Sequence, residues 1–314
     1  MHILVTGASG FIGRHLVSEL LSAGHHVTTL HRGAPLADRH DGGATVSVPH
    51  VRADALSDEA RAAAGVVDAV VHLAGRGDVQ ASFREPFEYN RLNALGTLNM
   101  LEGARASGAH VVLASTQRVY AMSSIPLRED APLSPADPYA HSKLVAEQWC
   151  GMYAGQLGVR TTVVRLFSVY GPGQVGQGTS GVVSIFVDRA MRGEPLAIHV
   201  SQRRDLTYVG DVARGIRLAV EQPPGPARGL RIYNIATGVG TSLEALARTA
   251  CSVTNSRSEI TPPLDGAHED DRVADIGGAR DDLGYRPLTS LDEGVRRVVE
   301  AYERAQAKRG ARPE

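Results

Sequence analysis

The sequence predicts an α/β protein in which a doubly wound parallel sheet is followed by a smaller C-terminal α/β lobe. In the first half of the chain, short and almost entirely apolar runs alternate with helical patterns, as expected for parallel strands that are buried on both faces. Right-handed crossovers between such strands distribute the helices over both faces of the sheet. After residue 166 the apolar runs shorten and Pro-rich breaks separate them, which indicates a second lobe.

The individual elements follow this alternation in chain order. The strands expected in the sheet are Ile3–Val5, Val27–Leu30, Val46–Val51, Ala69–Leu73, Val111–Ala114 and Thr161–Leu166, and the helices between them are Phe11–Ala23, Ser57–Ala64, Phe87–Ser107 and Pro138–Gln156. We therefore expect a sheet domain at residues 1–166 and a substrate-binding lobe at 167–304, some of whose elements can interleave with the sheet. The polar residues 305–314 are expected to form a frayed tail.

The composition excludes several classes of protein. A formal net charge of −1 gives no overall field that would attract nucleic acid or an anionic membrane. No segment approaches the roughly 20 apolar residues of a membrane span, and the chain runs directly into its first strand without a signal-peptide pattern. Cys150 and Cys251 show neither metal-ligand spacing nor a disulfide framework. These features predict a cytoplasmic protein without a metal site.

A glycine-rich turn joins the first strand to the first helix in the stretch VTGASGFIGRHL. Gly7, Gly10 and Gly13 are spaced three apart, with Phe11 and Ile12 between the last two. Small residues allow the backbone to approach a pyrophosphate, and the helix that follows offers free N–H groups and the positive end of its dipole. The position of the turn, between strand one and helix one, predicts a dinucleotide-binding Rossmann domain.

The end of the second strand predicts which dinucleotide is bound. An NAD site usually has an acidic residue there to accept hydrogen bonds from the ribose hydroxyls, but TTLHRG places His31 and Arg32 at this point. An arginine can form a forked contact with a 2′-phosphate, so NADP is favoured and NAD remains possible. Asp54 and Ala55, after the third strand, are candidates for contact with the adenosine. The small and apolar residues Leu73, Ala74 and Gly75 could lie along the cofactor.

The stretch YAHSK places Tyr139 and Lys143 four residues apart at the start of a helix, on one face. A nearby ammonium lowers the pKa of a tyrosine hydroxyl from its ordinary value near 10, which makes the tyrosine usable as a general acid and base. The chain has 33 basic residues, yet its only lysines are Lys143 and Lys308, so a lysine at this position indicates a need for a compact ammonium. Thr116 ends the preceding strand and could orient a substrate oxygen toward Tyr139.

These motifs together resemble the extended short-chain dehydrogenase/reductase family of nucleotide-sugar epimerases, dehydratases and ketoreductases. The glycine turn, VVHLAG, NALGT, STQRVY, YAHSK, RLFSVYGPGQ, RRDLTYVGDVA, YNIATG and LGYRP occur in the family's order over residues 2–300. The resemblance implies a Thr116–Tyr139–Lys143 catalytic triad, with Asn93, Tyr139 and Lys143 also near the cofactor. It implies a nucleotide-sugar substrate near Ser82, Gln117, Ser168 and Arg204, and a homodimer formed through Phe87–Ser107 and Pro138–Gln156.

The departures from the family pattern restrict the reaction. In the family's 4,6-dehydratases an Asp and a Glu follow the catalytic threonine, and here Gln117 and Arg118 stand at those positions. Neither side chain exchanges protons at useful pH, which argues against dehydration. Ser168 replaces a family asparagine. We expect NAD(P)-dependent oxidoreduction at C4 of a nucleotide-activated hexose: an NADPH-dependent 4-ketoreductase is favoured, with a 4-epimerase that retains NAD as the alternative and a non-catalytic NADP-binding sensor or scaffold as a remote one.

Overall fold

The computed structural model describes residues 1–36, 39–41, 44–123, 126–174, 181–199, 202–225, 229–262 and 271–310. Among these residues, a seven-stranded sheet forms the centre of the molecule, and each pair of neighbouring strands in it is parallel. The strands, in their order across the sheet, are β13 (Leu230–Ile235), β8 (Thr161–Leu166), β7 (His110–Thr116), β6 (Ala69–His72), β1 (His2–Thr6), β2 (His26–His31) and β5 (His50–Arg52). The predicted fold class is confirmed.

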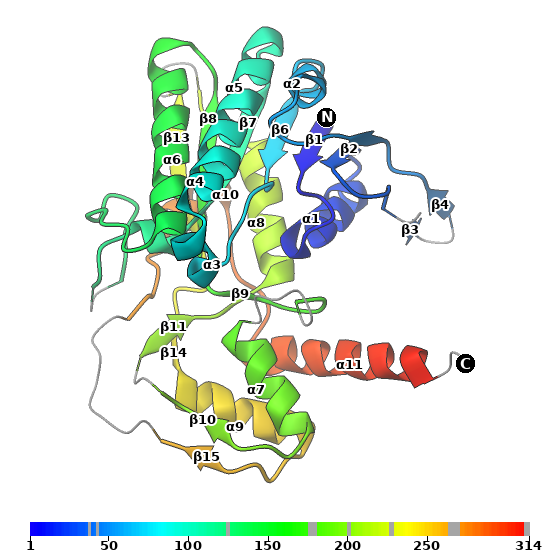
Figure 1. The fold of residues 1–314 in the computed structure, drawn as a ribbon, viewed down its shortest axis with the longest axis vertical. Helices are drawn as coiled ribbons and strands as arrows, with labels where there is room; N and C mark the ends of the chain where they lie inside the picture. Colours follow the sequence, from blue (N-terminus) through cyan, green and yellow to red (C-terminus); the bar gives the residue numbers. More distant parts are fainter. Residues whose placement is uncertain are drawn as a thin grey trace.

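Helices cover both faces of this sheet (Figure 1). Ile3 and Val5 of β1 pack in a core with α1 (Phe11–Ser22), α8 (Val209–Glu221) and α10 (Gly277–Leu283), while Leu4 packs in a second core with α2 (Asp58–Ala64), α5 (Gly96–Ser107) and α6 (Pro138–Gln156). Alternate residues of one strand therefore enter opposite cores, which explains why the strands read as continuous apolar runs.

A smaller lobe lies beyond the carboxyl ends of the strands (Figure 1). It has its own core, built from residues such as Phe186, Leu246 and Val298. Its elements are β9 (Val169–Tyr170), α7 (Val182–Met191), β10 (Leu196–Ala197), β11 (Arg203–Asp205), β12 (Thr207–Tyr208), β14 (Gly240–Ser242), α9 (Leu243–Thr254), β15 (Ile260–Thr261) and α11 (Leu291–Gly310). Because β13, α8 and α10 return to the sheet between these pieces, the chain crosses between the two parts more than once. The division at residue 166 stays a proposal.

Three local expectations differ from the structure. The run Val46–Val51 is not one strand: β4 (Ala44–Val46) pairs with β3 (Arg39–Asp41), and β5 begins only at His50, because Pro49 supplies no backbone N–H to a ladder. The long helix expected at Phe87–Ser107 is divided into α4 (Pro86–Asn90), the π-helical turn η1 (Arg91–Leu95) and α5. Of residues 305–314, which were expected to fray, 305–310 continue α11 to Gly310, and 311–314 lie outside the described residues. None of the described helices is both long and apolar enough to cross a membrane.

Candidate active site

A cavity of about 720 Å³ opens at the carboxyl ends of β1, β2, β5 and β6. A ligand of an open α/β sheet is expected at this edge. Nine of the residues predicted to bind the cofactor line the cavity: Gly7, Gly10, His31, Arg32, Asp54, Ala55, Leu73, Ala74 and Gly75. Its other lining residues include Ser9, Arg76, Glu88, Arg91 and Leu92, which the sequence did not single out.

The glycine turn brings the backbone of β1 and β6 close together. Gly7 has a φ of +66°, and a Cβ on it would lie 2.7 Å from the Ala74 amide nitrogen. A Cβ on Gly13 would lie 2.3 Å from the Gly7 carbonyl oxygen, so α1 can pack here only with glycine. Gly10 caps α1 without a side-chain hydrogen bond, which leaves the first-turn amides available to a phosphate. These features fit the pyrophosphate of a dinucleotide.

Phe11 and Ile12 lie beside the cavity without lining it. Both belong to the first turn of α1, but their side chains pack against the core of the C-terminal lobe. Neither they nor Gly13 line the cavity. If these residues take part in cofactor binding, Phe11 and Ile12 would do so through their backbone amides, and Gly13 through the close packing of α1 that it allows.

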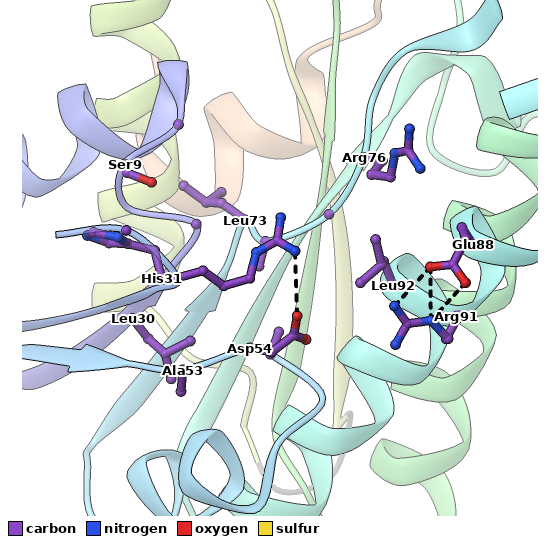
Figure 2. A pocket seen from close by; sticks show the side chains of 17 residues that line it. Ser9, Leu30, His31, Ala53, Asp54, Leu73, Arg76, Glu88, Arg91 and Leu92 are labelled. Atoms are coloured by element: carbon purple, nitrogen blue, oxygen red, sulfur yellow. Dashed lines mark hydrogen bonds and ion pairs between the residues drawn. The ribbon is translucent and has the colours of Figure 1, made fainter. Parts of the chain in front are cut away.

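The side chain of Arg32 forms an ion pair with Asp54, which Figure 2 labels among the lining residues of the cavity. Its Nη1 lies 3.8 Å from Oδ2 of Asp54, although 77% of its side chain is exposed. His31 is buried, and its ring packs at a tilt against that of His50 with the centroids 4.1 Å apart. Burial is the largest cause that lowers the pKa of His31. Glu88 adds a second carboxylate to the wall, paired with Arg91 at 2.9 Å. A 2′-phosphate would thus approach an arginine that already faces an acid.

The predicted catalytic residues meet where β7 ends and α6 begins. The side chain of Asp137 accepts a hydrogen bond from the Ala140 amide at 2.8 Å and caps α6, with Pro138 in its first turn. This start places Tyr139 and Lys143 one turn apart, facing the end of β7. Lys143 donates to the Ala114 carbonyl at 2.9 Å, and Thr116 lies near enough to the Tyr139 hydroxyl to lower its pKa. The structure therefore brings Thr116, Tyr139 and Lys143 together.

The electrostatics of this triad differ in one respect from the expectation. Burial raises the pKa of Tyr139, and the hydrogen bond with Thr116 and the charge of Arg118 oppose that rise. From the sequence, the Lys143 ammonium was expected to lower the pKa of Tyr139, but Lys143 is not among the groups that lower it in the structure. Burial lowers the pKa of Lys143 itself to about 8. Near neutral pH the lysine is still mostly protonated.

Asn93 connects the triad helix to the cofactor cavity. The π-helical turn η1 orients it so that its Oδ1 accepts from the Arg76 amide at 2.8 Å and its Nδ2 donates to the Ser142 hydroxyl at 2.9 Å. π-turns often occur at functional sites. A Cβ on Gly75 would lie 2.4 Å from the Asn93 Oδ1 and 3.6 Å from Lys143 Nζ. Asn93 and Lys143 therefore lie directly behind the cavity wall, although neither they nor Tyr139 line it.

The residues expected to bind substrate are placed less uniformly. Gln117 donates to the Ser168 hydroxyl at 3.2 Å, so these two do lie together beside Thr116. Ser82 is fully buried, and its hydroxyl donates to the Val79 carbonyl within α3 (Val79–Arg84). Arg204 lies on β11 in the C-terminal lobe, where its backbone pairs with Arg272.

Three residues that the sequence analysis did not assign to the site complete its framework: Arg118, Asp137 and Tyr89. Arg118 follows Thr116 in the short 3-10 helix η2 (Gln117–Val119) and pairs with Asp137 at 2.7 Å, where the carboxylate is also the cap of α6. Tyr89 stands edge-on to Tyr139 with ring centroids 6.4 Å apart. Asp137 and Arg118 lie 19 positions apart in the sequence, and no helical or strand periodicity relates two residues at that separation. Their ion pair could therefore not be predicted from the sequence. A capping motif before Pro138 was the one readable clue to Asp137.

A parallel sheet with a phosphate-binding turn, joined to a Thr–Tyr–Lys site at the strand ends, defines an enzyme of the extended short-chain dehydrogenase/reductase type. The model of the NAD dependent epimerase/dehydratase family matches residues 3–236, well over half of the chain. The chain belongs to this family, as the sequence motifs predicted.

Similar proteins are nucleotide-sugar enzymes. The chain is 32% identical to the UDP-glucose 4-epimerase of Mycolicibacterium smegmatis, over 96% of this chain and 98% of that protein. It is 30% identical to the UDP-glucuronic acid decarboxylase 1 of Xenopus tropicalis, over 96% of this chain and 72% of that protein.

Solved structures are similar over nearly the whole chain. The UDP-glucose 4-epimerase of Thermotoga maritima with UDP-glucose has a TM-score of 0.84 at 30% identity and covers 98% of this chain and 100% of its own. The Thermus thermophilus UDP-glucose 4-epimerase in complex with NAD has a TM-score of 0.82 at 30% identity and covers 96% and 99%.

These similarities change the balance between the two expected activities. They support the 4-epimerase alternative and NAD, and they do not support the favoured NADPH-dependent 4-ketoreductase. The physical reason lies in Arg32. The sequence treated it as an arginine available for a 2′-phosphate, but the fold places the Asp54 carboxylate opposite it.

Proposed function

We propose that this chain is a nucleotide-sugar 4-epimerase that uses NAD and acts on a UDP-hexose. The observation that carries the proposal is the meeting of Thr116, Tyr139 and Lys143 behind a cavity suited to a dinucleotide, with no further proton-exchanging side chain at the two positions after Thr116. The similarity to UDP-glucose 4-epimerases over nearly the full chain supports it.

The chemistry requires that C4 of the sugar lose a hydride and its hydroxyl lose a proton, and that both return with the hydride on the opposite face. NAD, when bound, accepts and returns the hydride. Tyr139 takes the hydroxyl proton as general base and gives it back as general acid. Thr116 orients the sugar oxygen toward Tyr139, and the charge of Arg118 favours the ionised tyrosine. The Lys143 ammonium, held one helical turn away by the Ala114 carbonyl, would add to this effect once the bound substrate excludes water from the site. The glycine turn and first amides of α1 hold the pyrophosphate.

The residues after Thr116 argue against an added acid–base step. Gln117 is an amide, and Arg118 is held by Asp137 at 2.7 Å, so neither exchanges a proton with C5 or C6. Dehydration would need such a group. Tyr139 and Lys143 are both present, which argues against a non-catalytic sensor.

The cofactor preference follows from the same cavity. Asp54 faces Arg32 at 3.8 Å, so a 2′-phosphate would have to compete with this carboxylate for the arginine, whereas the ribose hydroxyls of NAD are neutral. We therefore propose NAD in place of the NADP that Arg32 suggested.

We further propose a homodimer in the cytoplasm. Phe87 on α4, Leu95 on η1 and Met152 on α6 are large apolar side chains with 75%, 48% and 37% of their surface exposed. A hollow beside Met152 is lined by other residues of α6, including Trp149. Exposed apolar surface of this kind on two adjacent helices fits the expected pairing of helices between subunits. The free thiols Cys150 and Cys251 fit a reducing compartment.

The experiment that tests this function incubates the purified protein separately with UDP-galactose, UDP-glucose and UDP-glucuronic acid, without added cofactor. Interconversion of UDP-galactose and UDP-glucose is the expected result. Loss of carbon dioxide from UDP-glucuronic acid without hexose interconversion would identify a decarboxylase instead. A requirement for NADPH together with a 4-keto sugar would identify a ketoreductase. Either of these last results would overturn the proposal.

A further inference from the structure

A buried ionic cluster lies directly behind the triad. Ser115 donates a hydrogen bond to Oε1 of Glu147, and Glu147 forms a fork with Arg165, whose Nη2 lies 2.7 Å from Oε2 and whose Nε lies 3.1 Å from Oε1. The three side chains come from β7, α6 and β8. Arg165 and Glu147 are 2% and 5% exposed. We refer to Ser115, Glu147 and Arg165 as the clamp.

The clamp is anchored on its far side as well. Arg165 donates to the Glu129 carbonyl at 2.9 Å and lies 4.6 Å above the ring of Tyr120, in a cation–π contact. The Tyr120 hydroxyl in turn donates to Asn234 of β13 at 2.7 Å. The guanidinium of Arg165 is therefore held by contacts with Glu129 and Tyr120 in addition to its contact with Glu147.

Stability alone is a weak explanation for such a cluster. Removing two charges from water is costly, and well-packed apolar residues of similar volume often give equal or greater stability. A role in positioning would explain the cost, because buried hydrogen-bonded charges have few alternative arrangements. The residues next to the clamp indicate which groups it would hold in place.

Two members of the clamp, Ser115 and Glu147, adjoin catalytic residues. Ser115 immediately precedes Thr116 on β7. Glu147 follows Lys143 by four residues and Tyr139 by eight on α6, so it lies on the same helical face one and two turns later. The Ser115–Glu147 hydrogen bond thus links the strand that carries Thr116 to the helix that carries Tyr139 and Lys143.

We propose that the clamp positions the catalytic triad: it fixes β7 against α6 so that Thr116 and Tyr139 share one substrate oxygen, and it holds a carboxylate one turn behind the Lys143 ammonium. Ser115 and Glu147 are positioning residues and do not touch the substrate. The proposal rests on the proposed function, since it takes Thr116, Tyr139 and Lys143 as the reacting groups. A small misplacement of such groups is expensive for catalysis.

The charge of Glu147 gives the proposal a pH signature. Lys143 is faced by Glu147 and Cys150 of its own helix and by His72 of β6, and its ammonium contacts the Ala114 carbonyl of β7. Burial holds the pKa of His72 at about 3, so it is neutral, and burial raises the pKa of Cys150, so it is a neutral thiol. Glu147 is therefore the charged group among these neighbours, and it raises the pKa of Lys143 against the larger effect of burial.

The test compares Ser115→Ala, Ser115→Thr and Glu147→Gln with the unaltered chain. Ser115→Ala keeps the Glu147–Arg165 pair and is expected to lower kcat by about tenfold or more with KM and bound NAD unchanged, because only the alignment of Thr116 with Tyr139 is relaxed. Ser115→Thr keeps the hydroxyl and is expected to restore most of kcat. Glu147→Gln is expected to move the alkaline fall of kcat down by about one pH unit, because the ammonium loses its carboxylate.

The control is Glu221→Gln on α8. Glu221 is also a partly buried carboxylate with two partners, Arg217 at 2.7 Å and His25 at 2.9 Å. This change is expected to lower the melting temperature without changing kcat or its pH profile. An unchanged kcat in Ser115→Ala overturns the proposal even if Glu147→Gln does not fold. So does an unshifted pH profile in a folded Glu147→Gln.

Failure of the clamp can be told from failure of the proposed function. If Tyr139→Phe abolishes interconversion while Ser115→Ala retains full kcat, the triad stands and the clamp proposal falls. If Tyr139→Phe retains activity, the proposed function falls first.

Discussion

Changing Asp54→Asn should move the cofactor preference toward NADP. The amide keeps the size of the side chain, and its oxygen can still accept the hydrogen bond that Oδ1 takes from the Leu56 amide at 3.0 Å. The charge opposite Arg32 is lost. At 3.8 Å in a watery surrounding such a pair interacts by about 1 kcal/mol, and exposed pairs measure at or below that value. Releasing Arg32 therefore contributes up to about fivefold in affinity for a 2′-phosphate.

Removing the carboxylate also removes its repulsion of the phosphate, an effect of similar size. Together the ratio of NADP to NAD affinity should rise by up to about 25-fold at low salt and by less at 1 M salt, where the screening length is about 3 Å. Titration calorimetry on nucleotide-free protein gives both dissociation constants. Asp58→Asn is the matched control, since Asp58 pairs with Arg61 at 3.1 Å on α2 and does not line the cavity. An unchanged ratio in Asp54→Asn would refute the explanation given for NAD.

Four further predictions follow from named contacts. Tyr139→Phe should lower kcat by about 10²–10⁴-fold, the usual contribution of general acid–base catalysis, with NAD content unchanged by mass spectrometry. The pH profile of kcat should fall on the alkaline side near pH 8, because burial lowers the pKa of Lys143 to about 8. Lys143 is fully protonated well below pH 8 and loses its charge as the pH rises through that value. A kcat that stays constant up to pH 10 in a stopped assay would contradict this prediction. Gly7→Ala should lose bound NAD while the protein still folds, since its φ is +66° and the new Cβ would meet the Ala74 amide at 2.7 Å; thermal melting and nucleotide content measured on one sample separate the two effects. Met152→Asp should yield monomers in light scattering with circular dichroism unchanged, and a persistent dimer would place the subunit contact elsewhere.

Local patterns in the sequence were sufficient for much of the fold and the centre of the site. Residues four apart on a helix, such as Tyr139 and Lys143, lie on the same face. Glycines spaced as Gly7, Gly10 and Gly13 are typical of the turn between a strand and a helix that binds a dinucleotide. Parallel strands can be recognised as continuous apolar runs in the sequence because both of their faces are buried. These features depend on neighbours in sequence, where the geometry is known in advance.

Pairings between distant residues could not be predicted in the same way. Arg32 and Asp54 lie 22 positions apart and meet only because β2 and β5 are adjacent in the sheet. That one contact reverses the inference drawn from Arg32. Arg165 and Glu147 meet for the same kind of reason, across a helix and a strand. The charge of a side chain is readable from sequence, but its partner is a property of the fold.

The most direct test of the central claim uses UDP-galactose that carries deuterium at C4, with no added cofactor. If an NAD held by the enzyme takes and returns the same hydride while Tyr139 moves the proton, the UDP-glucose formed will retain deuterium at C4. Product without deuterium, or no product until NADPH and a 4-keto sugar are supplied, would contradict the claim.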